Sequence, residues 1–379
     1  GVVQKLKRKV IIAGTVLLLV LVSLLVYYCH GVRTRNAVEK LIQKKKIINI
    51  LVAGSNKDND HKHKFFAIVS INPDNKRIGI TFIPPSYKIR LDDDGDHCAR
   101  IDEVVVFNFN RLRYSLQKDL RLNIPFYVEI YAPDVERLVN LMEGVELFAL
   151  DQPGYKDRDA QAPVFGVNYL DGQKVMRYIN TVDENSIYLK YDRILDVIMT
   201  LYKDRERLER FNNIRFIGEM MKSVKTNLLP QEVMGICELI FKDGDVMATV
   251  LPGFFKDNYY AMDDITFRIY EKEFLALLIV DQSQKEIDAS IKIKILNGTD
   301  TPGLARKMRE SLIREGLNVV EFGTSPYRKM TKSVIINRRG NVAAVNRVAE
   351  LTGIQNIYHI IDNTQLHNIM IILGEDLAK

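Results

Sequence analysis

The stretch IINILVAGS, residues 47–55, decides the fold. It is an apolar run that ends at Gly54-Ser55, which is typical of a buried strand leaving a sheet into a loop. A second apolar strand is predicted at residues 65–72 and a third at 77–83. A turn at 73–76 separates them, so these two strands are expected to form a hairpin beside the first strand.

The chain beyond the hairpin alternates between strands and helices. A strand is predicted around residues 128–130, and helices are predicted at 133–142, 171–179 and 193–211. The mixed charges of residues 203–210 are expected to face solvent. This alternation predicts an α/β domain over residues 47–270, followed by a linker at 271–288.

A second, smaller domain is predicted over residues 289–379. Its elements are expected in the order strand, helix, strand, strand, helix, strand. The two helices are predicted at 304–315 and 342–352, and the last strand at 368–373. This order predicts a small α+β domain of the split-βαβ type.

Composition is compatible with two or three globular domains. The 379 residues are 47% hydrophobic and 27% charged, which argues against a disordered chain. The formal net charge of +6 is a mild excess of scattered basic residues, so nucleic-acid binding is not expected. The widely spaced Cys29, Cys98 and Cys237 match neither a disulfide framework nor a zinc site, and no cofactor is expected.

Residues 10–28, VIIAGTVLLLVLVSLLVYY, form an uncharged apolar run. At ~1.5 Å per residue a helix of this length spans a ~30 Å hydrocarbon layer. Residues 1–30 are therefore predicted to be a cytoplasmic tail and one transmembrane helix, and 31–46 a stalk. The compact basic tail favours a cytoplasmic N-terminus, with the bulk of the chain on the other side. The basic residues after the span leave a cytoplasmic body as the alternative.

Several short motifs, taken in order, carry a resemblance to a known family. They are Gly54-Ser55, Ser70-Ile71-Asn72-Pro73, Ile83-Pro84, Glu143-Gly144-Val145, Leu170-Asp171-Gly172, Leu251-Pro252-Gly253, Leu296-Asn297-Gly298 and Pro302-Gly303-Leu304. Over residues 47–376 the chain resembles the LytR-CpsA-Psr (LCP) proteins with a C-terminal LytR_C-like domain. The resemblance implies an α/β/α domain with a mixed central sheet. It also implies a single-pass protein of the bacterial cytoplasmic (inner) membrane, with its bulk periplasmic or extracytoplasmic.

Enzymes of this family transfer a polymer from a polyprenyl-pyrophosphate carrier to peptidoglycan. The resemblance implies carboxylates that hold Mg²⁺ and arginines that grip phosphate. At the matching positions this chain has Lys64 in place of an aspartate, Pro85-Ser86 in place of Arg-Asp, and Asn180 in place of an arginine. The catalytic site is therefore expected to be degenerate and free of metal. The matching cations, predicted to bind an anionic lipid head group, are Lys62, Arg100, Lys190 and Arg193.

Loss of a single charge-stabilising contact typically slows an enzyme ~10²-fold, so several such losses predict a pseudoenzyme. We expect a binding or scaffold protein of a cell-envelope assembly at the cell wall. Its expected partners are the membrane, a polyprenyl-phosphate lipid or peptidoglycan, and other proteins of the assembly. The alternative is an active glycopolymer transferase with a rearranged site.

Overall fold

The computed structural model describes residues 36–55, 65–92, 97–104, 109–150, 165–180, 187–242, 244–279 and 290–378. Within these ranges, no helix combines the length and the apolar character needed to span a membrane. The transmembrane helix predicted at residues 10–28 lies outside the described residues, and so do Lys62 and Lys64.

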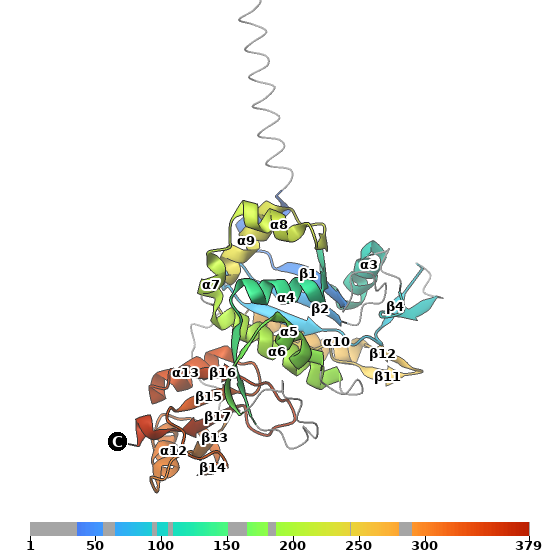
Figure 1. Ribbon diagram of the computed structural model, residues 1–379. Helices are drawn as coiled ribbons and strands as arrows, with labels where there is room; N and C mark the ends of the chain where they lie inside the picture. Colours follow the sequence, from blue (N-terminus) through green and yellow to red (C-terminus); the bar gives the residue numbers. More distant parts are fainter. Residues whose placement is uncertain are drawn as a thin grey trace, which may run out of the picture.

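A six-stranded mixed sheet forms the middle layer of the larger unit (Figure 1). In spatial order its strands are β10 (Val246–Val250), β3 (Ile78–Phe82), β2 (Phe65–Ile71), β1 (Ile48–Ser55), β6 (Phe126–Tyr131) and β9 (Lys225–Thr226). Strands β1, β2 and β3 pair antiparallel, which confirms the predicted hairpin. The pairs β1–β6 and β3–β10 are parallel, so the predicted mixed sheet is also confirmed.

Successive residues of β1 point to opposite faces of the sheet and enter two different cores. Ile48 and Ile50 face one core, whereas Leu51 and Ala53 face the other. The first core is covered by α2 (Ala37–Gln43), α6 (Ile187–Lys203) and α9 (Pro230–Ile240). The second is covered by α3 (Phe109–Leu120) and by the continuous helical run α10 (Asp264–Tyr270), η2 (Glu271–Leu275) and α11 (Ala276–Ile279).

The helical run from α10 to α11 extends past residue 270, where the sequence predicted a linker to begin. Phe274 and Leu278 are buried against the sheet. Gly79 on β3 permits this approach, because a Cβ there would lie 2.7 Å from a methyl carbon of Leu278. The side-chain amides of Asn72 and Asn75 donate to the Leu278 carbonyl, at 2.8 and 2.9 Å, and so satisfy the end of the helix.

Shorter elements surround this core. They are β4 (Lys88–Arg90), β5 (Cys98–Arg100), α4 (Ala132–Leu141), β7 (Val145–Ala149), β8 (Gly166–Leu170), α5 (Gly172–Asn180), α7 (Arg205–Glu209), α8 (Ile214–Met221), β11 (Phe254–Lys256) and β12 (Tyr259–Ala261). Within the predicted stalk, α2 packs on α9: Val38 is buried, and the backbone N–H of Ala37 donates to Glu232 Oε1 at 2.7 Å. Residues 37–43 therefore belong to the folded unit.

The C-terminal unit contains a five-stranded sheet in the order β14-β13-β17-β15-β16. Its elements are β13 (Lys292–Asn297), α12 (Leu304–Arg314), β14 (Asn318–Thr324), β15 (Val334–Asn337), α13 (Val342–Thr352), β16 (Ile357–His359), β17 (Ile369–Leu373) and the 3₁₀ turn η3 (Glu375–Leu377). The two helix crossovers, β13-α12-β14 and β15-α13-β16, each join neighbouring parallel strands. The split-βαβ prediction is therefore wrong, because the three-residue β16 was missed and β17 lies between the two crossover units rather than inside one.

The two units lie side by side (Figure 1) and share apolar contacts. Phe148 of β7 packs in the same buried cluster as Ile336 and Tyr358 of the C-terminal sheet. The Tyr358 hydroxyl donates to Glu146 Oε1 at 2.8 Å, and Lys203 Nζ donates to the Ile357 carbonyl at 2.9 Å. Lys203 is exposed, as predicted, and its ammonium also binds the neighbouring unit.

Candidate functional site

The Pro85-Ser86 segment follows β3 directly and is fixed through its backbone. The Asp102 N–H donates to the Pro85 carbonyl at 3.1 Å, and the Tyr260 N–H donates to the Ser86 carbonyl at 2.9 Å. Just before this segment, the Tyr191 hydroxyl of α6 donates to the Ile83 carbonyl at 3.0 Å. The side chains of Pro85 and Ser86 are half-buried and supply no charged metal ligand.

Tyrosine side chains border this segment. Tyr191 is buried and stacks on Phe82, with ring centroids 4.7 Å apart. The Tyr260 hydroxyl donates to the Leu251 carbonyl at 2.6 Å. Burial raises the pKa of Tyr191 and raises the pKa of Tyr260 to about 12. Both hydroxyls therefore stay protonated at neutral pH and act as hydrogen-bond donors that hold the backbone, not as general bases.

Arg100 pairs with Lys88 at the end of β5, and the backbone N–H of Asp102, two residues later, donates to the Pro85 carbonyl, so the backbone of Arg100 runs close to the Pro85 segment. Its guanidinium donates in a bidentate manner to Asp102, through Nε to Oδ1 at 3.0 Å and through Nη2 to Oδ2 at 2.8 Å. Glu103 Oε1 is 3.9 Å from Arg100 Nε. Hydrogen bonding to Asp102 raises the pKa of Arg100. The acidic residues two and three positions after Arg100 are the sequence signal for this pairing.

The described residues around Pro85 do not fit the Mg²⁺ site that the family resemblance implies. Both carboxylate oxygens of Asp102 accept hydrogen bonds from Arg100, so this carboxylate is already neutralised by a cation. Across the ranges that the structure describes, no group of three or more His, Cys, Asp or Glu side chains is arranged to hold a metal ion.

Arg193 and Asn180 lie at α5 and α6. The Arg193 side chain is buried; it donates through Nη1 to the Tyr178 carbonyl at 3.2 Å and lies 4.2 Å from the centre of the Tyr178 ring. Asn180 is the exposed last residue of α5, and Lys190 is half-buried on α6. The structure therefore brings Arg100 to Pro85 and Arg193 to α5. Head-group binding by Arg100, Lys190 and Arg193 stays a prediction.

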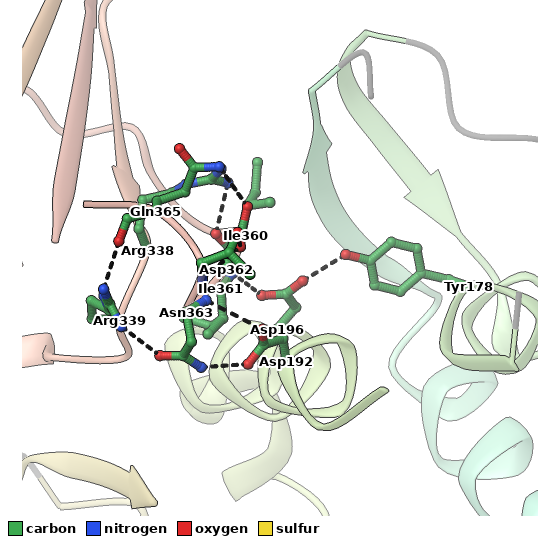
Figure 2. A network of polar contacts seen from close by, with 11 residues as sticks. Tyr178, Asp192, Asp196, Arg338, Arg339, Ile360, Ile361, Asp362, Asn363 and Gln365 are labelled. Carbon is green, nitrogen blue, oxygen red and sulfur yellow. Dashed lines mark hydrogen bonds and ion pairs between the residues drawn. The ribbon is translucent and has the colours of Figure 1, made fainter. Parts of the chain in front are cut away.

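Helix α6 also carries two acidic residues that bind the C-terminal unit (Figure 2). Asp196 is 1% exposed and accepts hydrogen bonds from the Ile361 N–H and from the Tyr178 hydroxyl, the latter at 2.6 Å. Asp192 accepts from the side-chain amide of Asn363 at 2.5 Å and from its backbone N–H at 3.3 Å. Burial raises the pKa of both carboxyls, that of Asp196 well above its ordinary value.

Arginines of the C-terminal unit hold the loop that α6 binds (Figure 2). Arg338 is buried and donates to the Ile360 carbonyl at 3.0 Å and to Asp362 Oδ2 at 3.3 Å. Arg339 donates to Asn363 Oδ1 at 3.2 Å. The helix on which Lys190 and Arg193 were predicted to bind a lipid head group is thus fastened to the C-terminal unit through its next turn.

A polar hollow of about 750 Å³ lies on the outer side of β4. Tyr87 and Phe267 contribute to its wall, and its charged lining residues are Lys88, Arg90, Lys118, Arg121, Asp119, Asp263 and Asp264. Two of the cations are paired, Arg121 with Asp264 at 3.0 Å and Arg90 with Asp119 at 4.0 Å. The near balance of four basic and three acidic side chains makes this a mixed-charge surface and not a strongly cationic pocket.

Comparison with protein families identifies the C-terminal unit. Residues 290–377 match the family model LytR_C, described as LytR cell envelope-related transcriptional attenuator. This match covers the whole five-stranded sheet, from β13 to β17. No curated protein matches the chain.

Comparison with solved structures identifies the fold of the larger unit. The structure described as "TagT bound to LI-WTA" is 17% identical, covers 62% of this chain and 92% of that chain, and has a TM-score of 0.52. The structure described as "TagT bound to LIIa-WTA" is 17% identical, covers 62% and 91%, and has a TM-score of 0.51.

A third structure, described as "LytR-CPS2A-psr family protein YwtF (TagT) with bound octaprenyl pyrophosphate lipid", is 18% identical, covers 62% of this chain and 91% of that chain, and has a TM-score of 0.47. TagT is a protein of B. subtilis. A likeness over 62% of the chain is too long for the LytR_C residues and must lie mainly in the larger unit. The chain is therefore a protein of the LytR-CpsA-Psr fold that carries a LytR_C domain at residues 290–377.

Proposed function

We propose that this chain is a membrane-anchored, extracytoplasmic protein of the bacterial cell envelope that binds or scaffolds and does not transfer polymer. In this proposal residues 10–28 cross the cytoplasmic membrane once and the LCP-like and LytR_C domains lie outside it. The ligand is a polyprenyl-phosphate lipid head group or a peptidoglycan strand. Protein partners in a larger envelope assembly complete the scaffold role.

One observation carries the non-catalytic part of the proposal. Where the resembled transferases have Arg-Asp, this chain has Pro85-Ser86, and the adjacent Arg100 is held by a bidentate ion pair with Asp102. A guanidinium held by a nearby carboxylate must break that pair before it grips a phosphate in the same way. Binding of a phosphate without catalysis has fewer requirements. Electrostatic attraction to nearby cations is sufficient, and neither a metal ion nor a precise geometry is needed.

A second candidate function is an active transferase with a rearranged site. Its supporting observation is that Asp102 and Glu103 both pair with Arg100, and that the Asp102 backbone is bonded to Pro85, although neither matches a carboxylate position of the family motif. If a phosphate displaced Asp102 from Arg100, that carboxylate would become available as a metal ligand. This reading requires that ligand binding depends on Mg²⁺.

Binding of octaprenyl pyrophosphate to the full chain in detergent micelles tests the proposal. We expect the same dissociation constant with Mg²⁺ and with EDTA. We also expect Lys190→Ala to weaken binding about tenfold, since a hydrogen bond to a charged group typically contributes about 1.5 kcal/mol. Isothermal titration calorimetry measures both effects.

Lys307→Ala is the matched control, because Lys307 is an exposed lysine on α12 of the LytR_C domain. It should bind as the parent chain does. Arg193→Ala is unsuitable as a binding test because the Arg193 side chain is buried against Tyr178. Binding that disappears in EDTA and returns with Mg²⁺ would favour the transferase instead.

A further inference from the structure

The described chain begins close to the proposed membrane span. Seven residues, 29–35, separate the apolar run from residue 36. A fully extended chain advances at most ~3.6 Å per residue, and eight steps lead from residue 28 to residue 36, so residue 36 lies within ~29 Å of the end of the span. Ala37 is fixed to α9 by its hydrogen bond to Glu232. If residues 10–28 span a membrane, α9 and the helices that pack on it must therefore lie near the surface of that membrane.

Helix α8 packs on α9 at that same end of the molecule (Figure 1). Ile217 faces inward and is 6% exposed, whereas Ile214 points outward and is 46% exposed. Gly218, four residues after Ile214 and so on the same face of the helix, has open space where a Cβ would stand. Phe211 and Phe216 pack against each other with ring centroids 4.9 Å apart, and both are half-buried, so Ile214 is the exposed large apolar side chain of this face.

Basic side chains surround this apolar face. Arg210 and Arg215 flank Ile214, and the guanidinium of Arg210 lies 5.2 Å from the centre of the Phe211 ring. The exposed lysines Lys40, Lys44 and Lys46 lie on or just after α2, which also packs on α9. Within the described ranges these five cations form no ion pair, so their charge is available to an external anion.

We propose that α8 and the turn before it lie against the anionic surface of the membrane that anchors the chain. This inference rests on the proposed anchor at residues 10–28. An apolar residue between arginines, on a helix within tether reach of a bilayer, is the arrangement of a helix that rests on a lipid surface. The cations contact phosphate head groups while Ile214 reaches the acyl boundary. The contact fixes the height and the tilt of the LCP-like domain above the membrane.

The chain has no tryptophan, so a single introduced tryptophan reports its own surroundings. Ile214→Trp places the probe on α8. Leu366→Trp places the control in the LytR_C domain, on the loop between β16 and β17, at a side chain that is 83% exposed. Each variant of the full chain is reconstituted into phosphatidylglycerol vesicles that contain lipids with brominated acyl chains. We expect the Ile214→Trp variant to lose most of its tryptophan fluorescence and the Leu366→Trp variant to lose almost none.

Three comparisons decide the outcome. Quenching of the Ile214→Trp variant should fall to the level of the Leu366→Trp variant when Arg210→Glu and Arg215→Glu are added, and it should fall likewise in phosphatidylcholine vesicles. Equal quenching of the two variants, or equal quenching of the α8 probe in charged and uncharged vesicles, would overturn the inference. Gly218→Trp on the same helix face repeats the test if Ile214→Trp does not fold.

Extraction of the vesicles at alkaline pH separates the two proposals. A chain that is washed off has no membrane anchor, which contradicts the proposed function. An Ile214→Trp chain that resists extraction and keeps its fluorescence unquenched contradicts the α8 contact alone.

Discussion

Asp196→Ala is expected to destabilise the protein by about 3 kcal/mol, because it leaves a buried backbone N–H and a buried hydroxyl without their acceptor. The affected donors are the Ile361 N–H in the LytR_C domain and the Tyr178 hydroxyl on α5. The same carboxylate also faces the guanidinium of Arg193. The substitution therefore breaks contacts both inside the larger unit and between the two units. Urea unfolding followed by circular dichroism measures the loss.

Asp196→Asn is the matched control. Asparagine keeps an oxygen for the Ile361 N–H and presents an amide to the Tyr178 hydroxyl, which can accept as well as donate. We expect its stability at neutral pH to lie within about 1 kcal/mol of the parent chain, since the buried charge is removed together with its desolvation cost. Equal, large losses for the alanine and asparagine variants would show that the two hydrogen bonds are not what Asp196 supplies.

The parent chain and the asparagine variant should also differ in their pH dependence. Burial raises the pKa of Asp196 above its unfolded value, so the folded state holds this proton to higher pH than the unfolded state does. The contribution of Asp196 is fully present below the unfolded pKa and is lost as pH rises toward the folded pKa. Relative to Asp196→Asn, the parent chain should therefore lose stability as pH increases from about 4. If the difference in unfolding free energy between the two chains stayed constant across that pH range, the raised pKa of Asp196 would be contradicted.

Gly172→Ala is expected to destabilise the LCP-like domain by about 2 to 3 kcal/mol. Gly172 begins α5, and a Cβ there would lie 2.3 Å from the Glu136 carbonyl oxygen and 2.5 Å from its Cα. Both atoms belong to the backbone of α4, so neither can rotate away. The two helices would have to separate, and Val139 and Val175 in the cluster they share would lose contacts. Thermal or urea unfolding measures the effect.

Gly218→Ala on α8 is the control, because open space surrounds the position where its Cβ would stand. Removing a glycine from a helix should stabilise it by about 0.5 to 1 kcal/mol. The two glycine substitutions should therefore change stability in opposite directions. If Gly172→Ala were neutral, the close contact of α4 and α5 would not be a constraint on the fold.

Local sequence patterns were sufficient to predict those strands and helices that each lie within a single apolar run. Strand β1 and the β2–β3 hairpin were predicted from a buried run, a turn and a second run, since their burial follows directly from composition. Strand β16 was missed because it has three residues and is too short to show a period of two. The helix over 271–279 was missed because residues 271–273 are all charged and the apolar run after them is short. The burial of Phe274 and Leu278 depends on β3.

The role of α6 could not be predicted from its charges alone. Tyr191, Leu195 and Met199 face the central sheet, and the adjacent positions Asp192 and Asp196 face the LytR_C domain. The apolar residues and the two aspartates are each spaced four residues apart, so each set lies on one face of the helix. A helix face that carries aspartates ordinarily contacts solvent. Only the tertiary structure shows that another domain covers it. The same limit applies to Arg100, whose partner Asp102 is two residues away on the chain and is brought to Pro85 by the β4–β5 hairpin.

Polymer transfer by the reconstituted chain tests whether the protein is catalytic. The full chain is incubated in vesicles with a polyprenyl-pyrophosphate-linked, radiolabelled glycopolymer and with peptidoglycan, in the presence of Mg²⁺ or EDTA. The expected result is no label in the peptidoglycan fraction under either condition, while the labelled lipid still binds the chain in EDTA. Label that enters peptidoglycan with Mg²⁺ and stays in the lipid fraction with EDTA would contradict the non-catalytic account and establish a transferase.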